Sequence, residues 1–348
     1  MTSNNNHIEF CINTLPKVSR TFAPTIRMLP KKLNVPVTVA YLLCRIADTI
    51  EDESSISSEE KQKLLHHYAH LFSANHPENN KIFFSRVKNI PEHSEDVVLL
   101  KNLPRVLAVY HSFSDEVQKR IGKWVVEMSL GMMKYAQSGE SRKYQFLKSV
   151  KELDEYTYYV AGTVGHMLTS LFEYFSQKIT PAVKSKLELF SESFGKGLQM
   201  VNIIRDMTAD LRRGQSYIPE EILHKYELTR RSIFLEHNSE RAQRLFNEMI
   251  QMAVDHLDKA LSYIINLPKE ETRIRLFCLL PFFWAMQTLR IVQTNTLALL
   301  EKDKVKISRK LIRIEFLKSL IFIFSNRLTI RHYNKIRRNI NTSLVPQI

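Results

Sequence analysis

The sequence predicts an all-α fold, and three observations support this prediction. Glycine accounts for only 8 of 348 residues, whereas its usual share is roughly 7%. Apolar residues recur at helical spacing over long stretches, with few prolines to interrupt them. A hydrophobic content of 44% can fill a substantial core. We expect one helical domain over residues 1–300 and a basic C-terminal tail over residues 301–348.

The N-terminal segment is expected to contain a polar start, a first helix and a loop. Residues 1–14 begin polar and lead into the helix. Residues 19–22 (Ser-Arg-Thr-Phe) then gather hydrogen-bond donors beside an aromatic ring. Taken alone, this cluster is typical of a helix cap with an exposed arginine. Residues 30–36 begin and end with proline and are expected to form a loop.

An acidic stripe marks the next helix, which is expected to end near Glu53. One face carries four polar residues spaced four, three and four positions apart: Tyr41, Arg45, Asp48 and Asp52. Residues at this spacing share a helix face. Glu51 lies beside the stripe and adds a third carboxylate.

Caps and small residues position the helices that follow. Residues 57–60 (Ser-Ser-Glu-Glu) match a capping box. Ser114 is a good N-cap for a helix that ends near Gln137. In the helix expected over residues 152–175, small residues leave room for a close neighbour or a kink. A further amphipathic helix is expected over residues 229–264.

A second acidic stripe lies on the central helix, which is expected to start at Thr180-Pro181 and to end near Arg213. Four polar residues on one face are spaced three, four and four apart: Gln199, Asn202, Asp206 and Asp210. Carboxylates one turn apart in an apolar helix repel each other and lose hydration unless a cation or hydrogen-bond donors compensate. Arg205 can supply that compensation in a purely structural polar layer. This helix alone leaves a polar layer and a metal site equally open.

The two stripes together favour facing walls of one cavity. Small, hard cations such as Mg²⁺ prefer oxygen ligands and bridge a few carboxylates to substrate phosphates. Arg45 and Arg205 are suited to hold phosphate oxygens by charge-assisted hydrogen bonds. We therefore interpret the two helices as the sides of a metal–diphosphate site.

The motifs on these helices resemble those of a known enzyme family. Residues 48–52 (Asp-Thr-Ile-Glu-Asp) and residues 202–210, which begin Asn-Ile-Ile-Arg-Asp, are similar to the two aspartate-rich motifs of the squalene/phytoene synthase family of head-to-head prenyltransferases. Three further segments match in the same order: residues 19–22, 156–165 and 277–281. The sequences of residues 48–52, 159–165 and 277–281 are more similar to those of squalene synthases than to those of phytoene synthases. The resemblance spans about residues 15–310.

The resemblance implies a fold and a reaction. The implied fold is a single-domain isoprenoid-synthase-type helical bundle around a central cavity. The implied reaction joins two farnesyl diphosphates through cyclopropyl presqualene diphosphate to squalene, with Mg²⁺ assisting diphosphate release and NADPH supplying a hydride. The family's second motif usually reads Asp-x-x-Glu-Asp, and here Ala209 replaces the glutamate. Asp206 and Asp210 are retained, so we expect metal binding to persist.

The resemblance also implies residue roles. The expected metal ligands are Asp48, Glu51, Asp52, Asn202, Asp206 and Asp210, of which the four aspartates also count as catalytic. The expected substrate contacts are Ser19, Arg20, Thr21, Phe22, Tyr41, Arg45, Tyr159, Gln199 and Arg205. Tyr156 is expected to steer proton transfer and to stabilise cationic intermediates, for which aromatic faces are suited.

Other products and cofactor sites remain open. The alternatives are a dehydrosqualene or phytoene-type product, presqualene diphosphate as the end product, and a non-catalytic membrane-associated scaffold of the same fold. No Gly-x-Gly-x-x-Gly follows a strand, which excludes a Rossmann site for NADPH. Lys306 lies in a basic segment that resembles one implicated in squalene synthases, so it is the expected cofactor contact. A basic tail facing lipid explains that segment equally well.

Charge and cysteine usage set the expected location and partners. From Lys304 onward, eleven lysines and arginines stand against one acid, so this part carries +10 of the net charge of +14. Apolar residues 316–324 among these charges suit a membrane-interface segment. Three widely spaced cysteines and the lack of an apparent secretory signal fit a reducing compartment. We expect a cytoplasmic monomer, peripheral at the membrane, that binds farnesyl diphosphate and no nucleic acid.

One strongly apolar stretch, residues 276–285, is expected to be a core helix. It is shorter than the roughly 20 residues that span a bilayer.

Overall fold

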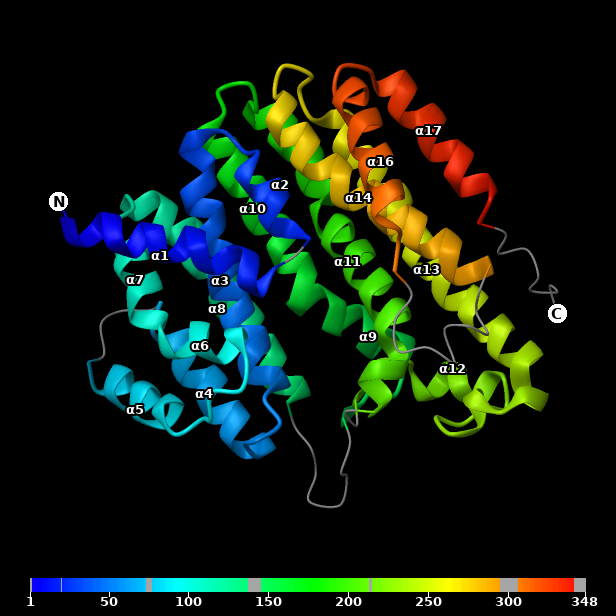
Figure 1. Ribbon diagram of the computed structural model, residues 1–348, viewed down its shortest axis with the longest axis horizontal. Coiled ribbons are helices and arrows are strands. Elements are labelled where there is room, and N and C mark those ends of the chain that lie inside the picture. The colour runs from blue at the N-terminus through cyan, green and yellow to red at the C-terminus, as the bar shows by residue number, and fades with distance from the viewer. Residues whose placement is uncertain are drawn as a thin grey trace. The chain divides into compact units, whose positions relative to one another are not determined.

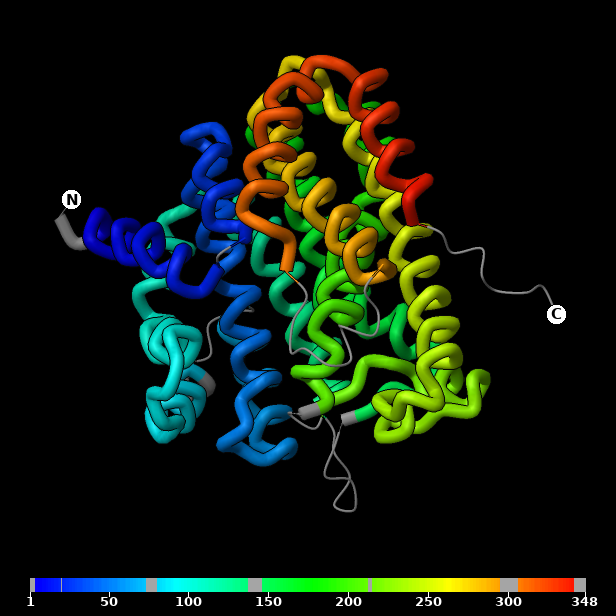
Figure 2. Tube along the Cα trace, turned by 45° about the vertical axis from the view of Figure 1, so that its right-hand side comes forward, coloured from blue at the N-terminus to red at the C-terminus, as the bar shows by residue number. Residues whose placement is uncertain are grey.

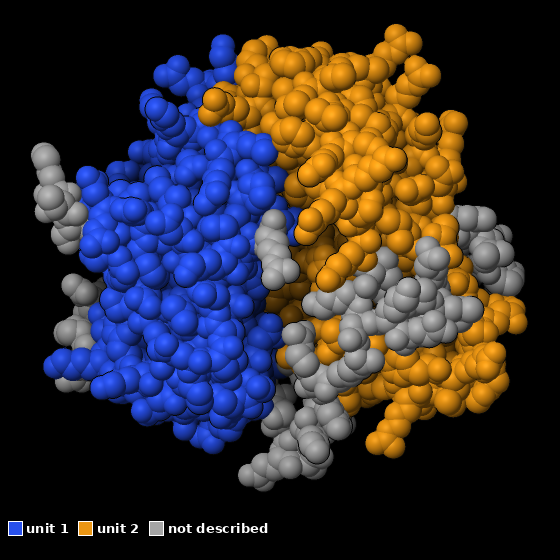
Figure 3. Space-filling view, viewed as in Figure 1, with its two compact units in different colours: residues 1–139, 166–184 blue, residues 140–165, 185–348 orange. Residues whose placement is uncertain are grey.

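The structure is a computed structural model that describes residues 2–19, 21–72, 77–136, 145–212, 215–294 and 306–340. These residues are helical almost throughout (Figure 1), which confirms the all-α prediction. The chain divides into two compact units (Figure 3), unit 1 with residues 1–139 and 166–184, and unit 2 with residues 140–165 and 185–348. The expected boundary near residue 300 stays a prediction.

Unit 1 is built around helix α3 (Lys31–Asp52), whose apolar side chains from Leu33 to Ile50 are buried. Around it lie α1 (Thr2–Val18), α2 (Phe22–Arg27), α4 (Ser58–His70), α6 (Glu95–Lys101), α7 (Leu103–His111) and α8 (Asp115–Tyr135), while α5 (Pro77–Lys88) packs on α4 and α6 (Figures 1 and 2). Ser57 accepts the N–H of Glu60 and caps α4, as predicted.

The expected loop over residues 30–36 is wrong, because α3 already begins at Lys31. Pro30 takes the extended N-cap position that precedes a helix. Pro36 lies inside the second turn, where its missing N–H removes a single intrahelical hydrogen bond. Burial of the apolar residues that follow outweighs that local loss.

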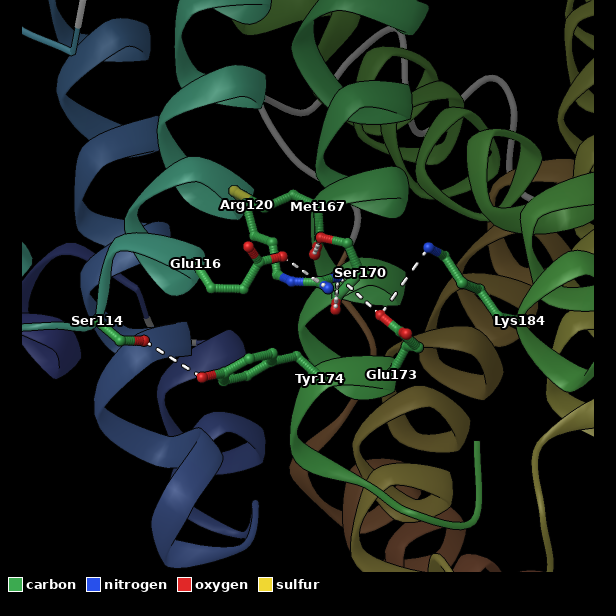
Figure 4. A network of polar contacts seen from close by, with 8 residues as sticks. All are labelled: Ser114, Glu116, Arg120, Met167, Ser170, Glu173, Tyr174 and Lys184. Carbon is green, nitrogen blue, oxygen red and sulfur yellow. Dashed lines mark hydrogen bonds and ion pairs between the residues drawn. The ribbon is translucent and has the colours of Figure 1, made fainter. Parts of the chain in front are cut away.

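A polar network within unit 1 joins α8 to the end of α10 (Thr163–Phe175), as Figure 4 shows. Arg120 donates to the Ser170 carbonyl at 2.9 Å and to Glu173 at 2.7 Å. The guanidinium therefore places a positive charge beside the C-terminal half of α10, where it interacts favourably with the helix dipole. Ser114 precedes α8 as predicted, but its side chain makes no capping bond; its Oγ instead lies 3.3 Å from the Tyr174 hydroxyl.

Unit 2 contains the helices that follow, short and long. They are α9 (Val150–Thr157), α11 (Pro181–Arg212), α12 (Glu220–Lys225), α13 (Ser239–Asn266), α14 (Thr272–Thr294), α16 (Arg309–Phe322) and α17 (Asn326–Arg338). Strands β1 (Gln145–Phe146) and β2 (Gln215–Ser216) form a short parallel pair. The helix expected from residue 229 begins only at Ser239, because two 3₁₀ turns, η2 (Ser232–Phe234) and η3 (Glu236–Asn238), precede it.

The helix expected over residues 152–175 is interrupted by a π-turn, η1 (Tyr158–Gly162). The small residues there allow backbone contact with α11. A Cβ at Gly165 would lie 2.0 Å from the Ser191 carbonyl oxygen, and one at Gly195 would lie 2.0 Å from that of Ala161. The predicted close approach is confirmed.

Helix α14 is the core of unit 2, and the apolar residues 276–285 are buried except for Trp284, which is half-buried. The prediction of a core helix is confirmed. The helix is 23 residues long, however, so the argument that it is too short to span a bilayer was wrong. By length and composition α3 and α14 could each cross a membrane, but 72% and 78% of their apolar stretches are buried. Burial in the core explains their composition.

Candidate functional site

Helix α3 places the first acidic stripe on one partly exposed face. Arg45 lies at its centre: one guanidinium nitrogen donates to the Tyr41 hydroxyl at 2.9 Å, and the other lies 3.7 Å from Asp48 Oδ2. The side chains of Arg45 and Asp48 are each 33% exposed. Asp52 is exposed at the helix end, whereas Glu51 is buried beside it. The predicted stripe is therefore a connected polar face.

Asp96 on α6 joins this face, which the sequence analysis missed. Its Oδ1 lies 3.9 Å from Arg45 Nε. Burial raises the pKa of Asp48 to about 6; Arg45 opposes that shift, while Asp52 and Asp96 add to it. Burial also raises the pKa of Asp96. Asp48, Asp52 and Asp96 set three carboxyl groups against the one guanidinium of Arg45, so this face has an excess of negative charge that a bound cation would offset.

Lys61 on α4 lies at the other end of the stripe. Its ammonium donates to the backbone carbonyl of Glu51 at 2.6 Å. Burial lowers the pKa of Lys61, and the charges of Asp52, Glu51 and Glu53 oppose that change. The lysine thus ties the end of α3 to α4 within unit 1.

The segment at residues 19–22 lies against the same helix. Ser19 Oγ accepts the N–H of Phe22 at 3.1 Å and so caps the start of α2. The Phe22 ring lies 5.9 Å, centroid to centroid, from the Tyr41 ring. Thr21 is exposed and makes no capping bond. Arg20 lies outside the described residues.

Helix α11 carries the second acidic stripe. The Asn202 amide donates to Gln199 Oε1 at 3.4 Å. Arg205 donates to both carboxylate oxygens of Asp206, at 3.0 Å and 2.5 Å. Asp206 is 18% exposed, and Asp210 is 6% exposed. A phosphate bound at Arg205 would have to share the guanidinium with Asp206.

Two tyrosines of the middle segment lie in unit 2. Tyr156 is buried, and its ring stacks on that of Tyr217 at 4.8 Å with an interplanar angle of 21°. Tyr159 belongs to the π-turn η1, where its carbonyl accepts the hydroxyl of Thr163 at 2.7 Å. Turns of this kind inside helices are frequent at functional sites. The sequence analysis missed Tyr217, because sequence spacing does not reveal a contact between residues so far apart.

The oxygen donors of the two faces have the chemistry that Mg²⁺ prefers. They come from six side chains: Asp48, Asp52 and Asp96 in unit 1, and Asn202, Asp206 and Asp210 in unit 2. Within the part of the chain that the structure describes, no three His, Cys, Asp or Glu side chains are grouped closely enough to hold a metal ion. The metal ligands therefore stay a prediction. So does the cofactor role of Lys306, which is exposed ahead of α16.

Comparison with known proteins agrees with the motifs. Squalene synthase ERG9 of Saccharomyces cerevisiae is 29% identical over 99% of this chain and 77% of its own length. Squalene synthase 1 of Arabidopsis thaliana is 31% identical over 83% of this chain and 66% of its own length. The matched region thus spans about two thirds to three quarters of these relatives.

A solved structure shows the same fold. TcSQS, in complex with the ligand BPH1237, has a TM-score of 0.83 at 23% identity, covering 99% of this chain and 94% of that one. The model of the squalene/phytoene synthase family matches residues 15–310. Because this match covers most of the sequence, the chain belongs to the squalene/phytoene synthase family.

Proposed function

We propose that this protein is a squalene synthase-like prenyltransferase that condenses two farnesyl diphosphates head to head, through presqualene diphosphate, to squalene. Family membership and the squalene synthases among its relatives support the reaction class. The observation that carries the proposal is the pair of acidic helix faces, on α3 and on α11, at the positions of the family's aspartate-rich motifs.

The side chains have distinct tasks in this reaction. Loss of the first diphosphate gives an allylic cation, which the double bond of the second farnesyl chain attacks; loss of a proton then closes the cyclopropane. Tyr156 offers its ring face to the cation and its hydroxyl to the proton. Its burial against Tyr217 fixes the ring and keeps water, which would quench the cation, away from it. Tyr159 supports it from the π-turn.

Mg²⁺, when bound, neutralises the leaving diphosphate. The ligands we propose are Asp48, Glu51, Asp52, Asn202, Asp206 and Asp210. Arg45 is already held in place by Tyr41, so it can orient a phosphate oxygen without a large loss of side-chain freedom. Asp48 would hold the cation as a carboxylate, because a pKa of about 6 leaves it mostly ionised at neutral pH.

NADPH supplies a hydride if squalene is the product. Lys306 is the proposed contact, and Arg309 and Lys310 are exposed close by in the sequence. Positive side chains suit the phosphates of this cofactor. Without such binding the product would be presqualene diphosphate or a dehydrosqualene-type hydrocarbon. These products, and a non-catalytic scaffold of the same fold, are the alternatives.

We further propose a cytoplasmic monomer at the surface of a membrane. The exposed basic residues of the C-terminal region support this location. So does the chemistry of the reaction, since the hydrocarbon product is insoluble in water.

Two carboxylate variants test the enzyme proposal. Asp48→Asn and Asp206→Asn should each lower diphosphate release from farnesyl diphosphate by about 100-fold or more, because each removes a carboxylate ligand of the Mg²⁺ that would neutralise the leaving diphosphate. Asp115→Asn, on an exposed position of α8, is the matched control. Undiminished turnover in either acidic-face variant would refute the assignment. Product analysis with farnesyl and geranylgeranyl diphosphate, with and without NADPH, identifies the product.

A further inference from the structure

The turn between α16 and α17 carries an exposed apolar patch. Eleven large hydrophobic side chains are exposed among the described residues, and five of them lie here. These five, which we call the apolar tip, are Leu317, Leu320, Ile321, Phe324 and Leu328. Three of them are more than half exposed: Leu317 at 62%, Ile321 at 60% and Phe324 at 63%. Figures 1 and 2 show α16 and α17 meeting at this turn.

The apolar tip continues one solvent-facing side of α16. On this helix, Leu320 and Ile321 lie three and four residues after Leu317, on the side where Arg309 and Arg313 are exposed nearer the helix start. The opposite side of α16 packs on α14, where Glu315 and Ser319 are fully buried. The apolar tip therefore faces solvent on the side of α16 that does not pack on α14.

Positive charge flanks the tip on both helices. Residues 306–340 contain ten lysines and arginines and a single acid, Glu315, which is buried. Helix α17 exposes a basic stripe with spacings of four, four and three: Arg327, Arg331, Lys335 and Arg338. Over residues 306–340, therefore, the exposed charged side chains are all positive.

We propose that the apolar tip inserts into the surface of an anionic phospholipid bilayer while the basic faces of α16 and α17 bind lipid phosphates. Apolar side chains bordered by lysine and arginine suit the boundary between headgroups and acyl chains. A second copy of this surface fits poorly, because two faces without exposed acids repel each other. The inference rests on the proposed membrane location and assigns it to one surface.

A labelled cysteine tests insertion directly. The native Cys11, Cys44 and Cys278 are buried, so an environment-sensitive fluorophore attached at Leu320→Cys reports on the tip alone. Vesicles of phosphatidylcholine with phosphatidylserine should shift its emission to shorter wavelength, and phosphatidylcholine alone should do so much less. The same label at Leu189→Cys, an exposed site on α11, should not respond. A shift that needs no vesicles would indicate self-association and overturn the proposal.

Two double variants distinguish the contribution of the basic side chains to vesicle binding from that of the apolar side chains. Arg327→Glu with Arg331→Glu should weaken sedimentation with anionic vesicles at least tenfold, and so should Leu317→Ser with Phe324→Ser. Lys119→Glu with Lys186→Glu makes the same charge change at exposed sites elsewhere and should have little effect. Unchanged binding in both tip variants would overturn the proposal.

Turnover of farnesyl diphosphate in detergent solution distinguishes the two proposals. The tip variants should keep wild-type turnover there. An active protein that ignores anionic vesicles overturns the membrane surface alone. An inactive protein that binds them through the tip overturns the proposed enzyme and leaves the surface standing.

Discussion

At Asp48, partial burial and the neighbouring carboxylates both raise the pKa of the carboxyl group. The pKa of about 6 means that the group is mostly ionised at neutral pH but gains a proton in mild acid. Arg45, one turn before it, limits the shift. Asp48 is therefore an anion whose charge is only partly offset by its neighbours. Binding of a divalent cation would be most favourable at such a carboxylate.

Tyr156 permits a test that leaves the stacked ring in place. Tyr156→Phe keeps the contact with Tyr217 but removes the hydroxyl. If the hydroxyl moves a proton, turnover should fall about 100-fold, the usual scale of general acid–base catalysis, with little change in melting temperature. Steady-state kinetics and thermal unfolding measure both. Tyr174→Phe, which removes an equivalent hydroxyl at an exposed site, should retain full turnover; the same result for Tyr156→Phe would exclude the role.

At the scale of elements, Arg275 joins three helix ends to α14. Its fully buried guanidinium donates to the carbonyls of Ile264 in the last turn of α13 and of Leu267 directly after it. It also donates to the carbonyl of Ile323 after α16 and to the Asn326 side chain at the start of α17. The positive charge offsets the negative ends of two helices. The C-terminal helices are thus fixed to the body of unit 2.

Removing this guanidinium should destabilise the fold strongly. Arg275→Met fills much of the volume but leaves three buried carbonyls and the partly buried Asn326 side chain without this donor, so we expect a loss of about 3–5 kcal/mol in unfolding free energy. Urea denaturation measures it. Arg273→Met, on the same helix but exposed, should change stability by less than about 0.5 kcal/mol. Equal stability of the two variants would contradict the assigned role.

Glu315 couples α16 to α14 and α17 in a pH-dependent way. Its carboxylate accepts from Gln287 at 2.9 Å and from His332 at 2.7 Å. Burial raises the pKa of Glu315. The hydrogen bonds and charges of His332 and Lys318 lower it by more than burial raises it, so the pKa lies below its ordinary value of 4.5. A carboxylate with a depressed pKa therefore stabilises the folded state fully when the pH is above its ordinary pKa. This stabilisation is lost as the pH falls through the pKa of the group in the folded state.

Glu315→Gln should therefore cost most stability well above pH 4.5. The difference in unfolding free energy from the wild type should shrink as the pH is lowered below that value, because the wild type then loses its ionised carboxylate. Denaturation curves at a series of pH values measure this difference. Glu236→Gln, at an exposed position, should give a difference that stays near zero. A Glu315→Gln difference that grows in acid would reverse the sign of the argument.

At the scale of the whole molecule, features that depend on residues close together in the sequence could be predicted, and contacts between distant residues could not. The stripes through Asp48 and Asp206 depend on helical spacing, so they were found, as was the cap at Ser57. Asp96 reaches Arg45 only through the packing of α6 on α3. Tyr217 likewise meets Tyr156 only in the folded unit. The helical turn at residues 31–36 depends on core burial outweighing a proline, which local propensity does not reveal.

The proposed function requires carboxylates of α3 and of α11 to bind Mg²⁺ together with diphosphate. Mg²⁺ with inorganic diphosphate should then raise the melting temperature by several degrees, since ligand at 100 times its Kd adds about 2.7 kcal/mol. Asp48→Asn and Asp206→Asn should each remove most of this shift, because each removes one of the carboxylates proposed to hold the metal. Mg²⁺ without diphosphate should give a smaller shift, and chelation should abolish both. Asp115→Asn should respond like the wild type in differential scanning fluorimetry. If either aspartate variant kept the full wild-type shift, its assignment as a metal ligand would be excluded.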